Sequence, residues 1–179
     1  MEFQLCHDFP KPDLEFCINA VRLGWSDVVR GLDYAVFSWK DVKDFADYRL
    51  KENNSKTFEY ENEISFLGKN EASKIIELGR QASESEVSDE EVISKKWQYL
   101  LLQWLFINRH DIDNPFGYVE SLWADFNYPL DMKNFIGFMP VEGEWNPMSH
   151  SEKENFERLT NNWEEFLKKL RGTLKEEVN

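Results

Sequence analysis

The side chains that could do chemistry in this chain are few, and most of them are neighbours in sequence. Cys6 adjoins His7, and His110 is followed by Asp111 and Asp113. Thiolate, imidazole and carboxylate groups all suit zinc. One ion could be bound by four of these residues, namely Cys6, His7, His110 and Asp113. Alternatively, the three residues His110, Asp111 and Asp113 could serve a metal-dependent or hydrolytic enzyme.

The spacing of these groups argues against both chemistries. Adjacent side chains rarely converge on one ion, and the chain has no second motif with metal-ligand spacing. It also lacks a glycine-rich phosphate loop, a GxSxG elbow and an HExxH motif. Cys17 recurs with Leu14 and Val21 on one predicted helix face, where burial would raise its pKa and make the thiol inert. We therefore predict no catalytic residue, no metal and no cofactor.

Acidic side chains dominate the charge of the chain. There are 34 Asp and Glu against 21 Lys and Arg, which gives a formal net charge of −13. This charge repels phosphate backbones and anionic membrane surfaces, so nucleic acids and membranes are unfavourable partners. It would instead favour association with a basic protein.

Two segments carry the acids most able to meet such a partner. Residues 84–91 hold five acids and no base, and a later loop has two acids around a tryptophan. The candidate partner-binding residues are Glu84, Glu86, Asp89, Glu90, Glu142, Glu144 and Trp145. For any one acid the competing role is solubility or interaction with the positive end of a helix dipole. Trp145 could instead pack into a groove of its own domain.

A helix over 88–108 is predicted to form the centre of the fold. From Trp97 to Ile107 the chain reads WQYLLLQWLFI, which is apolar on nearly every side of a helix and therefore typical of a buried one. Ser88 and Glu91 have the spacing of a capping box at its start. About 20 residues then precede the exit at Asn108, which is longer than an ordinary strand.

Two prolines after this helix predict two further short helices. Asn114-Pro115 and Tyr128-Pro129 each place a proline at a first helical position, where its missing N–H costs nothing. The predicted helices span 115–126 and 129–138, and each carries apolar residues on one face. Both faces should pack against the central helix.

The string NPFGYVESLWADFNYPLDMKNFIGFMP, which contains these prolines, resembles a bacterial family known as the domain of unknown function DUF2247. The resemblance is clearest over residues 97–140. It implies a small, soluble, mainly helical bacterial protein, and it supplies no site residues. Small acidic bacterial proteins of this kind are often immunity proteins, which protect a cell from a polymorphic toxin.

The rest of the chain also predicts helices. They span about 13–24, 28–36 with Ser26 as cap, 39–51 with Ser38 as cap, 60–67, 72–78 with Asn70 as cap, and a long C-terminal helix with a capping box at Ser149 and Glu152. Residues 1–9 are expected to form a short arm or strand. The length of 179 residues predicts one domain, 1–179. Two cysteines and the lack of a signal peptide or a spanning segment predict a cytoplasmic protein.

These observations predict an all-α, single-domain bundle around the helix over 88–108. The leading functional hypothesis is a non-catalytic bacterial immunity or antitoxin protein, which binds and neutralises a basic toxin domain through an acidic face. One alternative is the enzyme that uses His110, Asp111 and Asp113. A second alternative is a helical scaffold that binds a protein through its aromatic surface.

Overall fold

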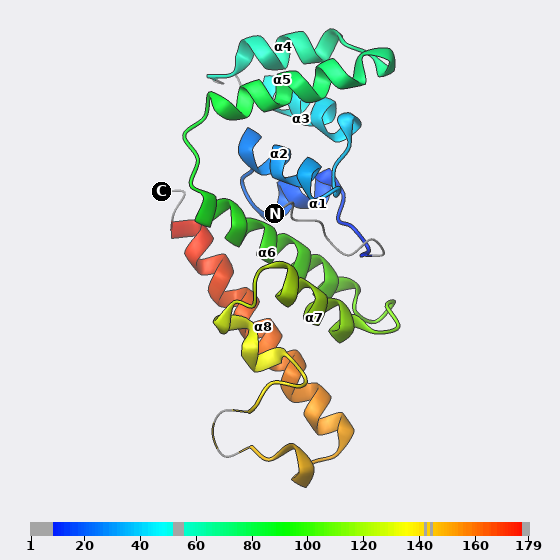
Figure 1. Cartoon of the computed structure of the whole chain (residues 1–179), viewed down its shortest axis with the longest axis vertical. Helices are drawn as coiled ribbons and strands as arrows, with labels where there is room; N and C mark the ends of the chain where they lie inside the picture. Colours follow the sequence, from blue (N-terminus) through cyan, green and yellow to red (C-terminus); the bar gives the residue numbers. More distant parts are fainter. Residues whose placement is uncertain (1–8, 52–55, 142, 144, 177–179) are drawn as a thin grey trace. The chain divides into compact units, whose positions relative to one another are not determined.

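Helices are the only regular secondary structure in the part of the chain that the structure describes. The computed structural model describes residues 9–51, 56–141, 143 and 145–176, and none of them forms a strand (Figure 1). The all-α prediction is therefore confirmed. The predicted arm or strand over 1–9 lies outside the described residues, apart from Phe9. None of the described helices combines the length and apolar character needed to cross a membrane.

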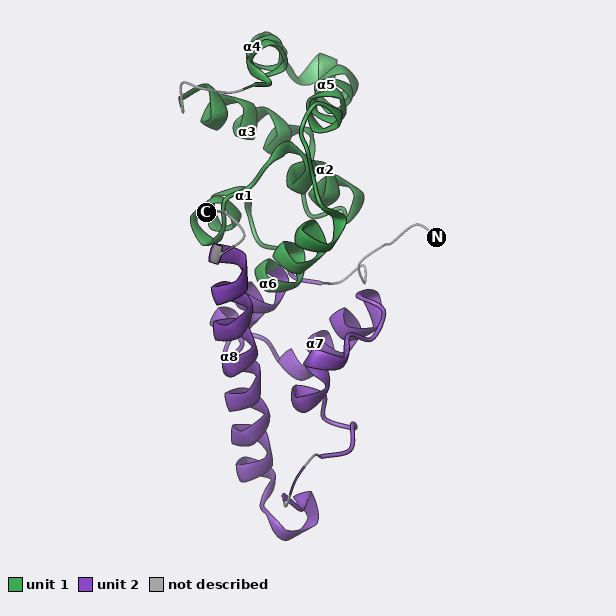
Figure 2. Ribbon diagram, turned by 90° about the vertical axis from the view of Figure 1, so that its left-hand side faces the viewer, with its two compact units in different colours: residues 1–5, 11–100 green, residues 6–10, 101–179 purple. Residues whose placement is uncertain are grey.

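The chain forms two compact units (Figure 2). Unit 1 contains the described residues from Lys11 to Leu100, and unit 2 contains Phe9, Pro10 and the described residues from Leu101 onward. The division falls inside the long helix α6, Glu90–Asn108, which contributes its first half to unit 1 and its second half to unit 2. Folding of both units as one domain stays a prediction.

Unit 1 is a set of short helices packed through aromatic side chains. They are α1 Leu14–Ala20, α2 Trp25–Asp33, α3 Trp39–Lys51, α4 Phe58–Phe66, the 3-10 turn η1 Lys69–Glu71 and α5 Ala72–Glu84, with the start of α6. α3 contacts α4 and α5, while α5 also contacts α2. Fully buried Trp25 meets Phe45 edge to face at 5.0 Å, and fully buried Trp97 meets Phe37 at 5.3 Å. These apolar faces explain why short helices are stable here, since tertiary burial rather than intrinsic propensity holds such helices.

Unit 2 packs around the indole of Trp163. Its elements after α6 are α7 Pro115–Asp125, the 3-10 helices η2 Leu130–Phe135 and η3 Pro147–Ser149, and α8 Glu152–Glu176. The Trp163 side chain is fully buried and makes ring contacts with Phe106, Phe116 and Phe135, which come from α6, α7 and η2. The second proline-led helix, predicted over 129–138, is thus a shorter 3-10 segment, although Met132 and Phe135 on it are buried as predicted.

Four predicted helix caps were wrong by a few residues, two of them in unit 1 ahead of α6. Ser26 lies inside α2, whose N-cap is Gly24. Asn70 lies inside η1, which precedes α5. In both cases a carboxylate accepts a hydrogen bond from the free backbone N–H at the helix start. Asp27 accepts from the Gly24 N–H at 2.8 Å, and Glu71 accepts from the Gly68 N–H at 3.2 Å. A carboxylate three residues after a glycine therefore replaced the expected hydroxyl cap.

The other two misplaced caps belong to the longest helices. α6 is capped by Asp89 rather than Ser88, because the Asp89 carboxylate accepts from the N–H of Glu91 at 2.8 Å. The capping box of α8 is formed by Ser151 and Glu154, with the Ser151 N–H bound to the glutamate at 2.8 Å. By contrast, the predicted Ser38 cap of α3 is confirmed, since its hydroxyl accepts from the Lys40 N–H at 3.3 Å.

The turn between α7 and η2 has an unusual backbone. Asn127 and Tyr128 have φ of 61° and 59°, a region that non-glycine residues rarely adopt. The Tyr128 N–H donates to the carbonyl of Trp123 at 2.8 Å, and the Trp123 indole N–H donates to the carbonyl of Pro129 at 3.1 Å. These bonds hold the left-handed pair in place.

Candidate functional site

A small pocket in unit 1 joins the start of α2 to the start of α6. Its volume is about 240 Å³. The residues with polar side chains that line it are Ser26, Asp27, Glu86, Ser88, Asp89 and Lys96, and the others are Gly24, Val87, Val92 and Ile93. We call it the Asp27 pocket. It contains two of the predicted partner-binding acids, Glu86 and Asp89.

Asp27 is the most buried charged group of this pocket. Only 2% of the residue is exposed, since it lies in the first turn of α2 beneath α6. Its Oδ2 atom accepts from the Gly24 N–H at 2.8 Å and from the Lys96 ammonium at 2.7 Å. Its Oδ1 atom is buried and has no hydrogen-bond partner among the described residues. Burial raises the pKa of Asp27, an effect that outweighs the lowering by Lys96 and by the Gly24 N–H.

Glu86 connects the segment before α6 to the N-terminus of α2. Its Oε2 atom accepts from the Trp25 N–H at 2.6 Å, and its Oε1 atom lies 3.5 Å from Nη2 of Arg49. A Cβ atom on Gly24 would lie 2.8 Å from Oε2 of Glu86. A larger residue at position 24 would therefore have to displace the Glu86 carboxylate. Glu86 is a structural cap as well as a wall of the pocket.

The other acids of the 84–91 segment lie outside the pocket lining or are used by the helix. Asp89 caps α6 at the rim, with its carboxylate 2.8 Å from the Glu91 N–H. Glu90 is exposed and forms an ion pair with Arg30. Glu84 is exposed at the end of α5. The segment itself has no base, but the fold brings bases to it from other elements.

Charge in and around the pocket remains negative after these bases are counted. The lining holds the carboxylates of Asp27, Glu86 and Asp89 and one ammonium, that of Lys96. Arg49 faces Glu86 from outside the lining. The lining alone therefore has three negative groups against one positive group, an excess of two negative charges. Arg49 is shared between Glu86 and fully buried Glu61.

The second predicted acidic site is only partly described. Glu142 and Glu144 lie outside the described residues. Trp145 is half-buried, stacks on the His150 ring with 3.6 Å between ring centroids, and donates from its indole N–H to Asn155 Oδ1 at 3.0 Å. These contacts match the alternative in which Trp145 packs against its own domain.

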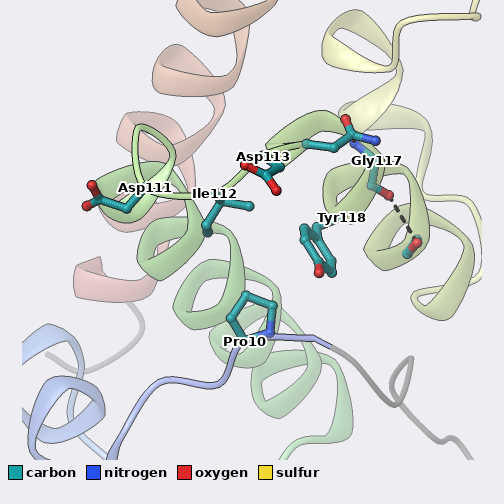
Figure 3. A pocket seen from close by; sticks show the side chains of 8 residues that line it. Pro10, Asp111, Ile112, Asp113, Gly117 and Tyr118 are labelled. Carbon is teal, nitrogen blue, oxygen red and sulfur yellow. Dashed lines mark hydrogen bonds between the residues drawn. The ribbon is translucent and has the colours of Figure 1, made fainter.

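The His110 region forms an open pocket in unit 2, of about 560 Å³ (Figure 3). Asp111, Asp113 and Tyr118 line it, whereas His110 does not. Figure 3 shows that the Asp111 carboxylate points away from Asp113. The two acids therefore do not converge on a reacting atom or an ion as acid–base catalysis or metal binding would require.

The described residues hold no other assembled group of candidates for chemistry. Within the described residues no group of three or more His, Cys, Asp and Glu side chains could hold a metal ion. Cys6 and His7 lie outside the described residues. The prediction for Cys17 is confirmed, because it is fully buried and desolvation raises the pKa of its thiol to about 12.

Sequence reasoning missed Asp27 and Lys96. The signal that could have found Asp27 is its position three residues after Gly24, which has the spacing of a reciprocal cap. Lys96 had no comparable signal, since it is 69 residues away from its partner in the chain.

No curated protein and no solved structure matches this chain. A family model does match residues 14–171, which is most of the chain, and it is described as "Uncharacterized protein conserved in bacteria (DUF2247)". This match extends the resemblance seen over 97–140 to both units. The chain belongs to the bacterial DUF2247 family.

Proposed function

We propose that this protein is a non-catalytic immunity or antitoxin protein that binds a basic toxin domain through the acidic surface of unit 1. The surface is defined by the Asp27 pocket and by the exposed acids Glu84 and Glu90 beside it in sequence. A toxin domain with a basic cleft would associate quickly with this surface and lose access to its anionic substrate.

The observation that carries the proposal is the Asp27 pocket. Three carboxylates line it, those of Asp27, Glu86 and Asp89, and a basic group of a partner would be attracted to them. The lining of the pocket has two more negative groups than positive groups. The formal net charge of −13 also makes association of the whole chain with a basic protein favourable. Together these features favour a basic protein over an anionic ligand.

The enzyme alternative has less support from the geometry. Its candidate acids, Asp111 and Asp113, point in different directions, and His110 is outside the pocket that they line. A hydrolytic site needs its groups within hydrogen-bond reach of one substrate atom. The proposal therefore rests on binding rather than catalysis.

The test is association with the C-terminal domain of a secreted toxin encoded beside this gene. We expect a one-to-one complex that abolishes the toxin's activity, with an association rate that falls as salt is raised. Reversal of two exposed acids, Glu84→Lys with Glu90→Lys, should slow association about tenfold. It should barely change stability, because the Glu90–Arg30 pair is at the surface. Stopped-flow fluorescence measures the rate.

A matched control uses exposed acids elsewhere in unit 1. Asp44 and Glu77 lie on α3 and α5, and neither lines the Asp27 pocket. Asp44→Lys with Glu77→Lys makes the same change in net charge and should slow association much less. Equal slowing by both pairs would assign the effect to overall charge and move the binding face elsewhere. No complex with the toxin domain would refute the proposed function.

A further inference from the structure

We propose that an exposed aromatic patch of unit 2 binds a short segment of a partner protein, one that presents large apolar side chains between lysines or arginines. The patch consists of Tyr128, Leu130 and Phe138, and we call it the Tyr128 patch. It uses none of the residues that line the Asp27 pocket in unit 1. The inference therefore goes beyond the proposed function and does not rest on it.

Three large apolar side chains are exposed in the Tyr128 patch. The exposed fraction is 56% for Tyr128, 76% for Leu130 and 65% for Phe138. Tyr128 and Phe138 meet the ring of buried Trp123 edge to face, with ring centroids 4.8 and 5.7 Å away. Leu130 follows Pro129, whose carbonyl accepts from the Trp123 indole N–H at 3.1 Å. Single exposed apolar residues are ordinary, but a contiguous group of them marks an interaction site.

The backbone holds the Tyr128 ring in its exposed position. Asn127 and Tyr128 both have left-handed φ values, 61° and 59°, which cost energy in residues other than glycine. The Tyr128 N–H donates to the Trp123 carbonyl at 2.8 Å, and the two side chains contact each other through their rings. A ring that is fixed before binding loses little conformational entropy when a partner covers it. The patch is therefore preorganised for contact.

The charges beside the Tyr128 patch favour a basic partner. The segment that carries the patch, 115–141, has three acids and one base, namely Glu120, Asp125, Asp131 and Lys133. Asp131 is exposed and directly follows Leu130 in the chain. Oε1 of Glu120 lies 3.3 Å from the position that a Cβ atom on Gly137 would take, so it borders the patch next to Phe138. Lysine or arginine side chains that flank an apolar group would be attracted to these acids.

The size of the Tyr128 patch fits a short segment better than a second copy of this chain. Three large side chains exposed to this degree present on the order of a few hundred Å² of apolar surface. A stable complex of standard size buries about 800 Å² on each partner. A symmetric contact between two copies would also bring the acids Glu120 and Asp131 of both copies together. A segment with one or two apolar side chains and flanking bases meets both constraints.

The probes for this inference are three hexapeptides added to the whole chain. Acetyl-KKLFKK-amide carries apolar and basic groups, acetyl-KKSSKK-amide keeps only the positive charge, and acetyl-EELFEE-amide keeps only the apolar pair. With the first peptide, two-dimensional NMR should show saturable shift changes at the Trp123 indole N–H and at the Leu130 and Phe138 amides. Each control peptide should bind at least about tenfold more weakly at these groups.

Matched variants test the residues of the patch. Phe138→Ser and Leu130→Ser should each weaken binding of acetyl-KKLFKK-amide about tenfold, because each removes an exposed apolar contact. Phe66→Ser is the control, since Phe66 is 80% exposed on α4 of unit 1, and it should leave binding unchanged. Asp131→Lys should also weaken binding, whereas Asp44→Lys, the same change at an exposed position of α3, should have a much smaller effect. Far-UV circular dichroism checks that each variant is folded.

Four results would overturn the inference. The first is the absence of saturable changes at the patch with acetyl-KKLFKK-amide, and the second is equal binding of either control peptide. The third is unchanged binding in Leu130→Ser, the variant that decides the matter if Phe138→Ser does not fold. The fourth is a wild-type dimer, or sedimentation of the wild type with phosphatidylcholine vesicles, that Phe138→Ser abolishes, since the patch would then bind a second copy or a lipid surface.

Discussion

Substituting Gly31 with alanine tests how unit 1 is packed. Gly31 lies in α2, and a Cβ atom there would be 2.3 Å from Cδ2 of Phe37 and 2.7 Å from Cζ2 of Trp97. Real Cβ atoms do not approach other carbons so closely. Both rings are buried and touch each other edge to face at 5.3 Å, so neither can move aside freely. Glycine is unfavourable inside a helix, but the close approach of the two rings requires it at this position of α2.

The size of the effect follows from two opposing terms. Replacing a helical glycine with alanine stabilises a helix by about 1 kcal/mol. Forcing a methyl group into a well-packed core costs about 1–3 kcal/mol. The overlap with two buried rings places Gly31→Ala at the upper end of that range. We expect a net loss of about 2 kcal/mol, which corresponds to a fall in Tm of about 4–8 °C for a protein of this size.

Gly172 provides the matched control. It is exposed in α8, and no atom of the described residues lies within 4 Å of the position that its Cβ would take. Gly172→Ala should therefore stabilise the protein by about 0.5–1 kcal/mol. Urea unfolding followed by far-UV circular dichroism measures both variants. If the two units unfold separately, each substitution should shift only the transition of its own unit.

The result that would refute this reasoning is a Gly31→Ala protein at least as stable as the wild type. Such a protein would show that Phe37 and Trp97 can separate at little cost. Destabilisation by Gly172→Ala would be a different failure, because it would mean that the end of α8 is not an open helix surface.

Three further predictions concern buried polar groups. Glu61→Ala should lower the free energy of unfolding in urea by about 3–5 kcal/mol. The reason is that fully buried Glu61 accepts hydrogen bonds from the Trp25 indole at 3.1 Å and from the Thr57 hydroxyl at 2.8 Å. A loss below about 1 kcal/mol would contradict this. Cys17 should not react with iodoacetamide at pH 8 until urea unfolds the protein, because the pKa of its thiol is raised to about 12. Mass spectrometry of the peptide that contains Cys17 measures the alkylation. Burial raises the pKa of Asp27 above the unfolded value of about 3.9, so the folded state binds the Asp27 proton more tightly than the unfolded state does. The contribution of the protonated Asp27 to stability therefore falls as pH rises through the folded pKa. The unfolding free energy of the wild type minus that of Asp27→Asn should therefore decrease as pH rises above about 4, and a flat difference would argue against it.

Local patterns predicted most of the helices, because the interactions that start a helix lie within four residues of each other. The Ser38 cap and the Asn114-Pro115 start are both confirmed, and α3 has the predicted bounds, Trp39–Lys51. The Asn114 side chain accepts from the Gly117 N–H at 3.0 Å, as a cap should. These starts need no information from the rest of the chain.

Where several capping residues stand in a row, the sequence did not discriminate between them. Ser88 and Asp89 can both cap α6, and Ser149 and Ser151 can both precede α8. The structure uses Asp89 and Ser151. Each choice leaves the same apolar residues facing inward, so the helix is predicted correctly even when its first residue is not.

The candidate site was less predictable, because its groups meet only in the fold. Glu86 and Asp89 were identified as acids of interest, but residues 84–91 contain no base and the sequence does not show which bases the fold brings to them. Glu86 binds the N–H of Trp25, 61 residues earlier in the chain, and Asp27 binds Lys96, 69 residues later. Hydrophobic periodicity reports which face of a helix is buried and carries no information about which charged groups pair across helices.

The left-handed turn at Asn127 and Tyr128 bears on how this family is recognised. The turn lies within WADFNYP, part of the string that resembles the family. Its hydrogen bonds, including that from the Trp123 indole to the Pro129 carbonyl, stabilise the backbone conformation of the turn. The Asp27 pocket, in contrast, draws its residues from separate segments that no contiguous motif contains. Residues that make a protein easy to classify are therefore distinct from residues that meet only in the folded chain. Relatives that share this turn need not share the pocket, and the positions equivalent to Asp27, Glu86, Asp89 and Lys96 are where such divergence would be visible.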